Sequence, residues 1–299
     1  HPRRVPAMSF NAFFSTSICY GAGAPEAGWT LAFPITLPLI GVALLYAVGA
    51  IRLWRRSSRG RPDRMRQALL FAAGWGVLTA ALVSPIHALG ERVFAAHMIE
   101  HEFLMAVAAP LLVAACPGAV LIWALPASFR RGTGKLTRGR TLQSAWAFAT
   151  RSLNATIIHG IAIWIWHIPA LFQAALQQGI LHYAQHASFL GTALLFWWVL
   201  LPRPGRQQTY GSSVMHLFFT SLHTGLLGVL LLVSPKLWYP ENGAGAALWG
   251  LSPIEDQQLA GLVMWVPAGL IYGGAALLLA GLWISNSATR EAEHALDPG

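Results

Sequence analysis

Four histidines form two pairs with the same spacing, and each pair opens an apolar stretch. One pair is His97 and His101, and the other is His182 and His186. Two residues four apart lie on one face of a helix, with Cβ atoms about 6 Å apart, so both imidazoles of a pair can reach one metal ion. Imidazole is a ligand for copper, zinc and iron. The spacing therefore predicts two arms of a metal site, each on its own helix.

Other side chains with ligand atoms accompany the two pairs. Glu100 shares the helical arc of the first pair. His167 ends the apolar stretch that precedes the second pair, and Asp256 opens the last apolar stretch. Two further histidines, His159 and His223, fall nearer the middle of their stretches. The predicted ligand set is therefore His97, His101, His167, His182, His186, Glu100 and Asp256, with His159 and His223 as deeper members. Within it, His167 and Asp256 act either as further ligands or as residues that orient the imidazoles.

The composition is that of a membrane protein. Of the 299 residues, 55% are hydrophobic and 10% are charged, whereas soluble domains carry about 25% charged residues. Seven stretches approach the roughly 20 apolar residues that span a bilayer; they are 31–51, 67–86, 94–116, 153–170, 182–201, 212–234 and 258–283. The prediction is an all-α, polytopic membrane protein with a seven-transmembrane-helix bundle. Residues 119–125 are apolar but short, which indicates an interfacial or re-entrant piece.

The basic residues orient this bundle. With the N-terminus outside, only four of the 20 Lys and Arg lie outside, namely Arg3, Arg4, Arg92 and Lys236. This bias toward the cytoplasmic side follows the positive-inside rule. The predicted organisation is an extracytoplasmic segment 1–30, a seven-helix membrane domain 31–285 and a cytoplasmic tail 286–299, in a bacterial cytoplasmic (inner) membrane. On this topology most of the histidines gather at the outer leaflet, so the metal site opens outward.

Several short blocks of sequence follow one another in an order that is typical of one family. They are HMIEHE (97–102), AAPLL (108–112), WHIPALF (166–172), HYAQH (182–186), FWW (196–198), DQQLAG (256–261) and MWVP (264–267). Together, over roughly residues 30–285, they resemble the caa3-type CtaG family of cytochrome c oxidase assembly factors. Agreement over several blocks is far more specific than a single pair of histidines.

The resemblance implies a seven-helix membrane protein that is needed for maturation of haem–copper oxidases and that handles their copper. The positions that match the family motifs are His97, His101, His167, His182, His186 and Asp256. Glu100 stands where glutamine is common in the family. A different, single-span copper chaperone shares the name, but this chain does not resemble it. Its two cysteines, Cys19 and Cys116, form no paired-cysteine copper motif and are predicted on opposite sides of the membrane.

Three other classes of protein are disfavoured by particular residues. The zinc-protease motif HExxH begins at His101, but Met105 stands where its second histidine is required. A retinal protein needs a lysine within a helix, and the only lysines, Lys135 and Lys236, fall in predicted loops. The net charge of +9 follows from the topology, and without a soluble domain it does not indicate a nucleic-acid partner. We expect a binding protein and not an enzyme.

Three interpretations of the histidines stay open. The preferred one is a copper carrier, in which the outward cluster binds a copper ion and delivers it to haem–copper oxidase subunits. A soluble extracytoplasmic copper chaperone is then a candidate donor, and membrane lipid surrounds the protein. The second is a b-type haem protein, with axial ligands drawn from His159, His167, His216 and His223. The third is a metal-ion transporter, in which His159, His223 and His216 form steps toward the cytoplasm.

Overall fold

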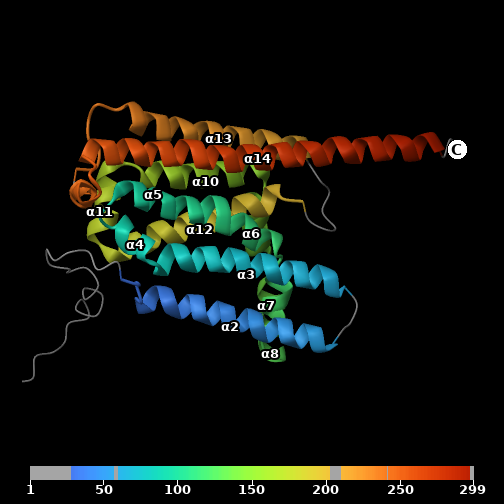
Figure 1. Ribbon diagram of the computed structural model, residues 1–299. Helices are drawn as coiled ribbons and strands as arrows, with labels where there is room; N and C mark the ends of the chain where they lie inside the picture. Colours follow the sequence, from blue (N-terminus) through green and yellow to red (C-terminus); the bar gives the residue numbers. More distant parts are fainter. Residues whose placement is uncertain (1–27, 57–59, 203–209, 241, 297–299) are drawn as a thin grey trace, which may run out of the picture.

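The computed structural model describes residues 28–56, 60–202, 210–240 and 242–296. Over these ranges the protein is built from helices and contains no strand, as the composition predicts. Figure 1 shows that the longer helices run roughly along a common direction. Most of the predicted N-terminal segment 1–30, including Cys19, lies outside the described residues.

Short connections join most of the helices. In chain order the first are α2 (Phe33–Arg56), α3 (Arg61–Val83), α4 (Pro85–Gly90), α5 (Phe94–Glu102), the π-helical η1 (Phe103–Ala108), α6 (Ala109–Ala114), α7 (Gly118–Ala124), α8 (Ala127–Leu136) and α9 (Arg140–Ala149). They are followed by α10 (Ser152–Trp166), α11 (Pro169–Gln177), α12 (Gly179–Leu200), α13 (Tyr210–Val233), the 3-10 helix η2 (Asn242–Trp249) and α14 (Pro253–Leu296). Proline occupies the first position of α4, α11 and α14, where its missing N–H costs nothing.

Each of the seven predicted stretches overlaps a helix. Five helical segments are long and apolar enough to cross a membrane: Phe33–Arg56, Arg61–Val83, Phe94–Ala114, Tyr210–Val233 and Pro253–Ser287. Ser152–Trp166 and Pro169–Gln177 make a sixth if they form one bent span. α12 has 22 residues and coincides with the stretch predicted over 182–201, but its histidines and Gln185 lower its hydropathy. Five or six of the seven therefore have both the length and the composition of a span.

Two of these segments depart from a regular α-helix near a proline. η1 joins α5 to α6 directly before Pro110. Pro110 has no N–H to donate to the carbonyl four residues earlier, and a π-turn accommodates such a defect. α10 ends at Trp166, and α11 continues at an angle of 75° to it. Ile168 is extended there, because a residue before proline avoids the helical conformation. The stretch predicted over 153–170 is therefore bent.

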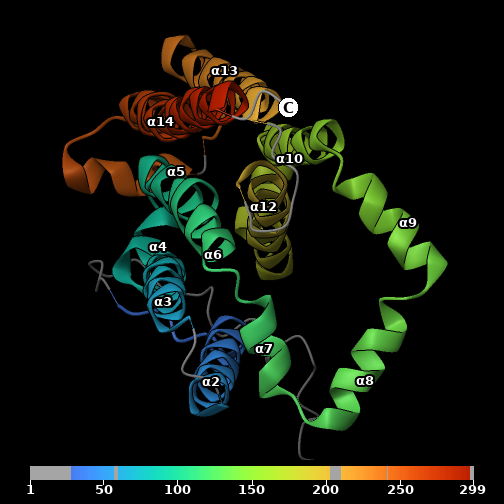
Figure 2. The same ribbon diagram turned by 90° about the vertical axis from the view of Figure 1, so that its right-hand side faces the viewer.

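The central helices of the bundle carry the paired histidines. Figure 2, which looks along the helices, shows α5–α6 and α12 between a flank formed by α13 and α14 and a flank formed by α2 and α3. α13 and α14 approach closely because Gly228 faces Gly261, and a Cβ on either glycine would meet the carbonyl of the other. Small residues permit such close contacts inside membranes. Among the candidate spans, Phe94–Ala114 is the most enclosed.

The piece predicted to be interfacial or re-entrant over 119–125 is α7. Its seven residues are too few to cross a bilayer. α7 packs against α2, where Gly49 leaves room for the carbonyl of Val120. From α7 the chain continues through α8 and α9 in an arch that returns to α10 (Figure 2). This arch carries five of the basic residues that were predicted on the cytoplasmic side, namely Arg130, Arg131, Lys135, Arg138 and Arg140.

Candidate metal centre

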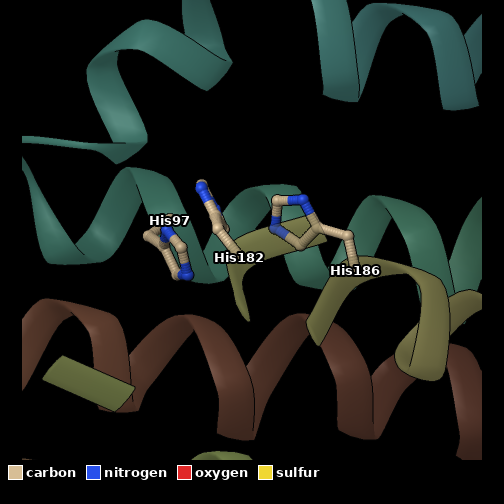
Figure 3. A group of neighbouring side chains, drawn as sticks. All are labelled: His97, His182 and His186. Atoms are coloured by element: carbon tan, nitrogen blue, oxygen red, sulfur yellow. The ribbon is translucent and has the colours of Figure 1, made fainter. Parts of the chain in front are cut away.

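The structure brings the two histidine pairs together. His97 and His101 lie on α5, His182 and His186 lie on the first turns of α12, and all four are buried. The ring centroids of His97 and His182 are 5.5 Å apart, and those of His101 and His186 are 5.2 Å apart. In Figure 3, the rings of His97, His182 and His186 come from the two helices into one space. The pairs are thus arranged as facing arms.

Three of these imidazoles have the geometry to share an ion. One ring nitrogen from each of His97, His182 and His186 lies within 4.8 Å of the other two. Nitrogens bound tetrahedrally to one ion at about 2.0 Å are about 3.3 Å apart, so modest side-chain rotations close the set. His101 does not belong to this triad, because its ring packs edge-on against His97 and Phe189.

Two carboxylates extend the cluster. Oε1 of Glu100 lies 2.7 Å from Nδ1 of His87 and 3.6 Å from Nε2 of His186. These three residues form a second group whose ligand atoms lie within 4.8 Å of one another. A third such group consists of His87, Glu91 and His182, and in it Glu91 is exposed. Each group shares one histidine with each of the others, so the ligand atoms form a continuous set from the interior to the surface.

His87 belongs to the cluster although its position in the sequence did not mark it as a ligand. It lies on the short helix α4, where Ser84 is the N-cap and accepts a hydrogen bond from the N–H of Ile86 at 3.2 Å. Pro85 occupies the first helical position. This capping residue and proline start a helix, and that helix turns His87 toward Glu100. In the sequence, Ser84 and Pro85 indicate a helix start just before His87, and this was the signal that could have identified His87.

His87 and Glu100 form a buried hydrogen-bonded pair within the cluster. Burial lowers the pKa of His87, whereas the hydrogen bond and the charge of Glu100 raise it, and the net shift is upward. A proton on His87 is therefore favoured beside this carboxylate. Because metal ligands must be deprotonated, an ion bound at His87 would displace that proton.

Many polar atoms of the cluster have no hydrogen-bond partner within the part of the chain that the structure describes. They include both ring nitrogens of His97 and His101, Nε2 of His182 and His186, and Oε2 of Glu100. Buried polar atoms are nearly always hydrogen-bonded, and leaving one unpaired costs about 1–3 kcal/mol. A cation would accept the nitrogen lone pairs that the protein leaves unengaged, so the donor set fits a bound metal ion.

Asp256 holds the helix that carries the first pair. Its two carboxylate oxygens accept hydrogen bonds from the backbone N–H groups of Phe94 and Ala95, at 2.8 and 2.9 Å. These N–H groups at the start of α5 have no partner within the helix, and a negative charge is favourable there. Asp256 was predicted as a ligand or as a residue that orients the imidazoles. Both oxygens are engaged by α5 and neither belongs to a ligand group, so the geometry favours the orienting role.

His167 lies beside the cluster, at the bend between α10 and α11. Its Nδ1 donates to the carbonyl of Ile163 at 2.7 Å. The other nitrogen, Nε2, then carries a lone pair and has no partner among the described residues. The ring centroid lies 6.4 Å from that of His101, and Tyr239 steadies the bend by donating its hydroxyl to the carbonyl of His167 at 2.6 Å. His167 is oriented like a ligand but stands outside the three groups.

His159 and His223, predicted as deeper ligands, lie in a separate set between α10, α12 and α13. Nδ1 of His159 lies 3.0 Å from Oγ1 of Thr192. Because that hydroxyl donates its proton to the carbonyl of Ser188 at 2.8 Å, it accepts from His159. Nδ1 of His223 accepts a hydrogen bond from Nε1 of Trp164 at 3.3 Å. The structure does not bring these two histidines into any of the three ligand groups.

All residues of the cluster fall in a stretch that matches a known family. The family model, described as cytochrome c oxidase caa3 assembly factor (Caa3_CtaG), matches residues 44–286. No curated protein and no solved structure matches the chain. The family match covers well over half of the sequence, including both histidine pairs and the helices that position them. The chain therefore belongs to the Caa3_CtaG family of cytochrome c oxidase caa3 assembly factors.

Proposed function

We propose that this assembly factor binds a copper ion in the cluster formed by α4, α5 and α12 and passes it to a haem–copper oxidase subunit. The main support is the triad of His97, His182 and His186, whose buried rings come from two helices and whose nitrogens lie within 4.8 Å of one another. Nitrogen sites generally bind copper more tightly than the other divalent first-row metals. Copper is also a component that an oxidase of this class has to acquire during assembly.

Charge balance supports a cation at this position. Glu100 is fully buried, and among the described residues its ion-pair partners are the histidines His87 and His186. A buried carboxylate without a full counter-charge is costly. An ion between Glu100 and the imidazoles would supply that charge in place of the proton on His87, while the neutral imidazoles would add ligand atoms without adding charge.

The overlap of the three ligand groups supports stepwise release. An ion that leaves the triad for His87 and Glu100 keeps His186 as a ligand. An ion that moves on to Glu91 keeps His87. Replacing one ligand at a time avoids a bare charge in the interior, which would be the most costly state. Since Glu91 is exposed, the route would end where the ligands of an acceptor can take over.

We also infer the topology that this function requires. Seven spans would place the N-terminus outside and the C-terminus in the cytoplasm of a bacterial cell. Figure 1 supports this arrangement, because α4 and α11 lie at the end of the bundle opposite the C-terminus of α14. The positive-inside rule assigns the basic end to the cytoplasm, so the cluster would face outward. An oxidase subunit or a soluble extracytoplasmic copper chaperone could then reach it, and binding with transfer needs no catalytic turnover.

Metal analysis of the detergent-purified protein, with a visible spectrum of the same sample, tests the proposal. We expect near-stoichiometric copper without a Soret band, and loss of copper in the double variant His97→Ala/His182→Ala. His216→Ala is a matched control, because His216 lies outside the cluster with Nδ1 3.1 Å from Oγ1 of Thr156. If the folded double variant kept all its copper, the assigned site would be wrong.

The spectrum and a separate uptake experiment distinguish the two alternatives from the carrier. A Soret band with reducible α-bands would favour a b-type haem protein and direct attention to His159, His167, His216 and His223. A transporter would move copper into sealed proteoliposomes, and that uptake would depend on His159 and His223. The carrier predicts copper binding without such uptake.

A further inference from the structure

A pocket lined by four arginines lies away from the histidine cluster, toward the opposite end of the bundle. Arg52, Arg55 and Arg56 come from the last turns of α2, Trp123 comes from α7, and Arg130 comes from α8. We call these five residues the arginine pocket, and its volume is about 260 Å³. We propose that the arginine pocket binds the phosphate of an anionic phospholipid headgroup.

The arginine pocket has a positive charge that the described protein leaves unbalanced. Within the described ranges, no carboxylate lies within 4.0 Å of any of its four guanidinium groups. Residues 57–59, which follow α2 in the sequence, are Ser-Ser-Arg and so add no acidic residue. Guanidinium stays protonated at any physiological pH. Four like charges around one small volume repel each other, and a bound anion relieves that repulsion.

Specific contacts hold the arginine pocket together. Nη1 of Arg52 donates to the carbonyls of Trp123 and Ala124, at 3.2 and 2.7 Å, where α7 ends. The guanidinium carbons of Arg56 and Arg130 lie 5.0 and 4.5 Å from the centroid of the Trp123 ring. The face of an indole attracts cations, so Trp123 gathers two arginines that would otherwise separate. Each guanidinium carries five N–H donors, so many remain for a ligand.

Phosphate matches this donor set. The planar guanidinium group binds two phosphate oxygens through parallel hydrogen bonds, which makes arginine the usual choice for a phosphate site. The volume of the arginine pocket is small and its lining is cationic, which suits a phosphodiester better than a bulky anion. Its chemistry therefore specifies a phosphate group, and the surrounding surface indicates where that phosphate comes from.

An apolar stripe leads along α2 to the arginine pocket. Leu44, Val48 and Ile51 follow one another at helical spacing and are exposed, and Arg55 continues the same stripe. Ile122, next to Trp123 on α7, is also exposed. In a bilayer such surfaces contact acyl chains. A lipid can therefore lie with its chains along α2 and its phosphate among the arginines, and basic pockets between transmembrane helices bind anionic headgroups in this way.

Native mass spectrometry of the full detergent-purified protein tests the proposal with phosphatidylglycerol and phosphatidylcholine of identical acyl chains. We expect phosphatidylglycerol to stay bound and phosphatidylcholine to be lost. Arg56→Gln/Arg130→Gln should weaken phosphatidylglycerol binding roughly 30-fold, the factor expected for two basic residues at an anionic lipid. Arg52 is kept in this variant because it caps α7. The charge-preserving variant Arg56→Lys/Arg130→Lys should lose part of the affinity, since lysine cannot bind phosphate in a bidentate manner.

A matched control removes the same charge outside the arginine pocket. Arg138→Gln/Arg140→Gln lies at the connection between α8 and α9, where both side chains are exposed, and should keep the wild-type affinity. An equal loss in this control would show that only bulk charge matters and would overturn the proposal, as would equal retention of phosphatidylcholine. Displacement of the lipid by inorganic phosphate at a similar concentration would overturn the lipid source and indicate a soluble anion. An unchanged melting temperature shows that the glutamine variant is folded.

Discussion

Two groups of histidines lie in this bundle, and they differ in how their ring nitrogens are engaged. In the cluster between α5 and α12, His97 and His101 have no hydrogen-bond partner at either nitrogen within the described residues. In the inner group between α10, α12 and α13, each of His159, His216 and His223 has one nitrogen within 3.3 Å of a threonine or a tryptophan. Only the second nitrogen, Nε2, of His159 and His223 has no partner among the described residues. Both groups lie on helices that are apolar overall.

The difference separates a candidate ligand from an ordinary interhelical contact. A histidine that bonds to a threonine on the next helix stabilises the bundle by about 1 kcal/mol and leaves one of its nitrogens satisfied. Four facing imidazoles with unengaged nitrogens destabilise the bundle unless a ligand engages them. The number of histidines in a segment is therefore a weaker indicator of a metal site than the partners of their nitrogens.

The largest effect is expected from His186→Ala. His186 belongs to two of the three ligand groups. Changing a residue that only supports a metal ligand already lowers metal affinity roughly tenfold or more, so the loss of His186 itself should lower copper affinity by at least that factor. Copper titration of the purified protein measures this change. His159→Ala is the control and should keep its copper. Equal losses in both variants would remove the distinction between the two groups.

A smaller effect is expected from Asp256→Ala, which leaves every imidazole in place. The variant loses the carboxylate that caps α5 at Phe94 and Ala95, and such a loss costs about 1–2 kcal/mol of stability. Because α5 carries His97, copper affinity should also fall, and Asp256→Asn should fall less because one amide oxygen still accepts. The melting temperature and copper titration give both quantities. A lower melting temperature with unchanged copper affinity would show that the triad does not depend on this cap.

The sequence predicted the histidine arms because helical spacing is a local property. Residues four apart lie on one face of any helix, so His97 with His101 and His182 with His186 could be paired without knowing the fold. His87 could not be assigned in this way. Its place in the cluster depends on the packing of α4 on α5, where Gly90 lies so close that a Cβ would be 3.1 Å from Cα of His97.

Contacts between distant segments explain the other differences. The arginine pocket joins Arg52 to Trp123, 71 residues away in the chain, so no local pattern predicts it. The roles of Asp256 and His159 likewise depend on partners on other helices, namely the N-terminus of α5 and Thr192 on α12. The helices themselves were predictable because runs of apolar residues with few breaks specify membrane helices on their own.

A change in rate, without loss of binding, is expected from Glu91→Gln. Glu91 belongs only to the exposed ligand group and not to the triad, so the variant should bind copper normally. An amide is a weaker ligand than a carboxylate, and the last step of release should slow several-fold. Copper transfer to a soluble chromogenic chelator, followed by absorbance, measures the rate. Glu255→Gln is a matched control on the exposed start of α14, and an equal slowing there would contradict a role for Glu91 in release.

The smallest effect is expected in the inner group, from Thr192→Val. The hydroxyl of Thr192 donates to the carbonyl of Ser188, so it accepts from Nδ1 of His159. Valine keeps the shape but removes that acceptor, which should lower the stability by about 1 kcal/mol or less. Copper affinity should not change, because His159 belongs to none of the ligand groups. A loss of copper in this variant would connect the inner histidines to the metal and would favour a path through the bundle over a site at one end.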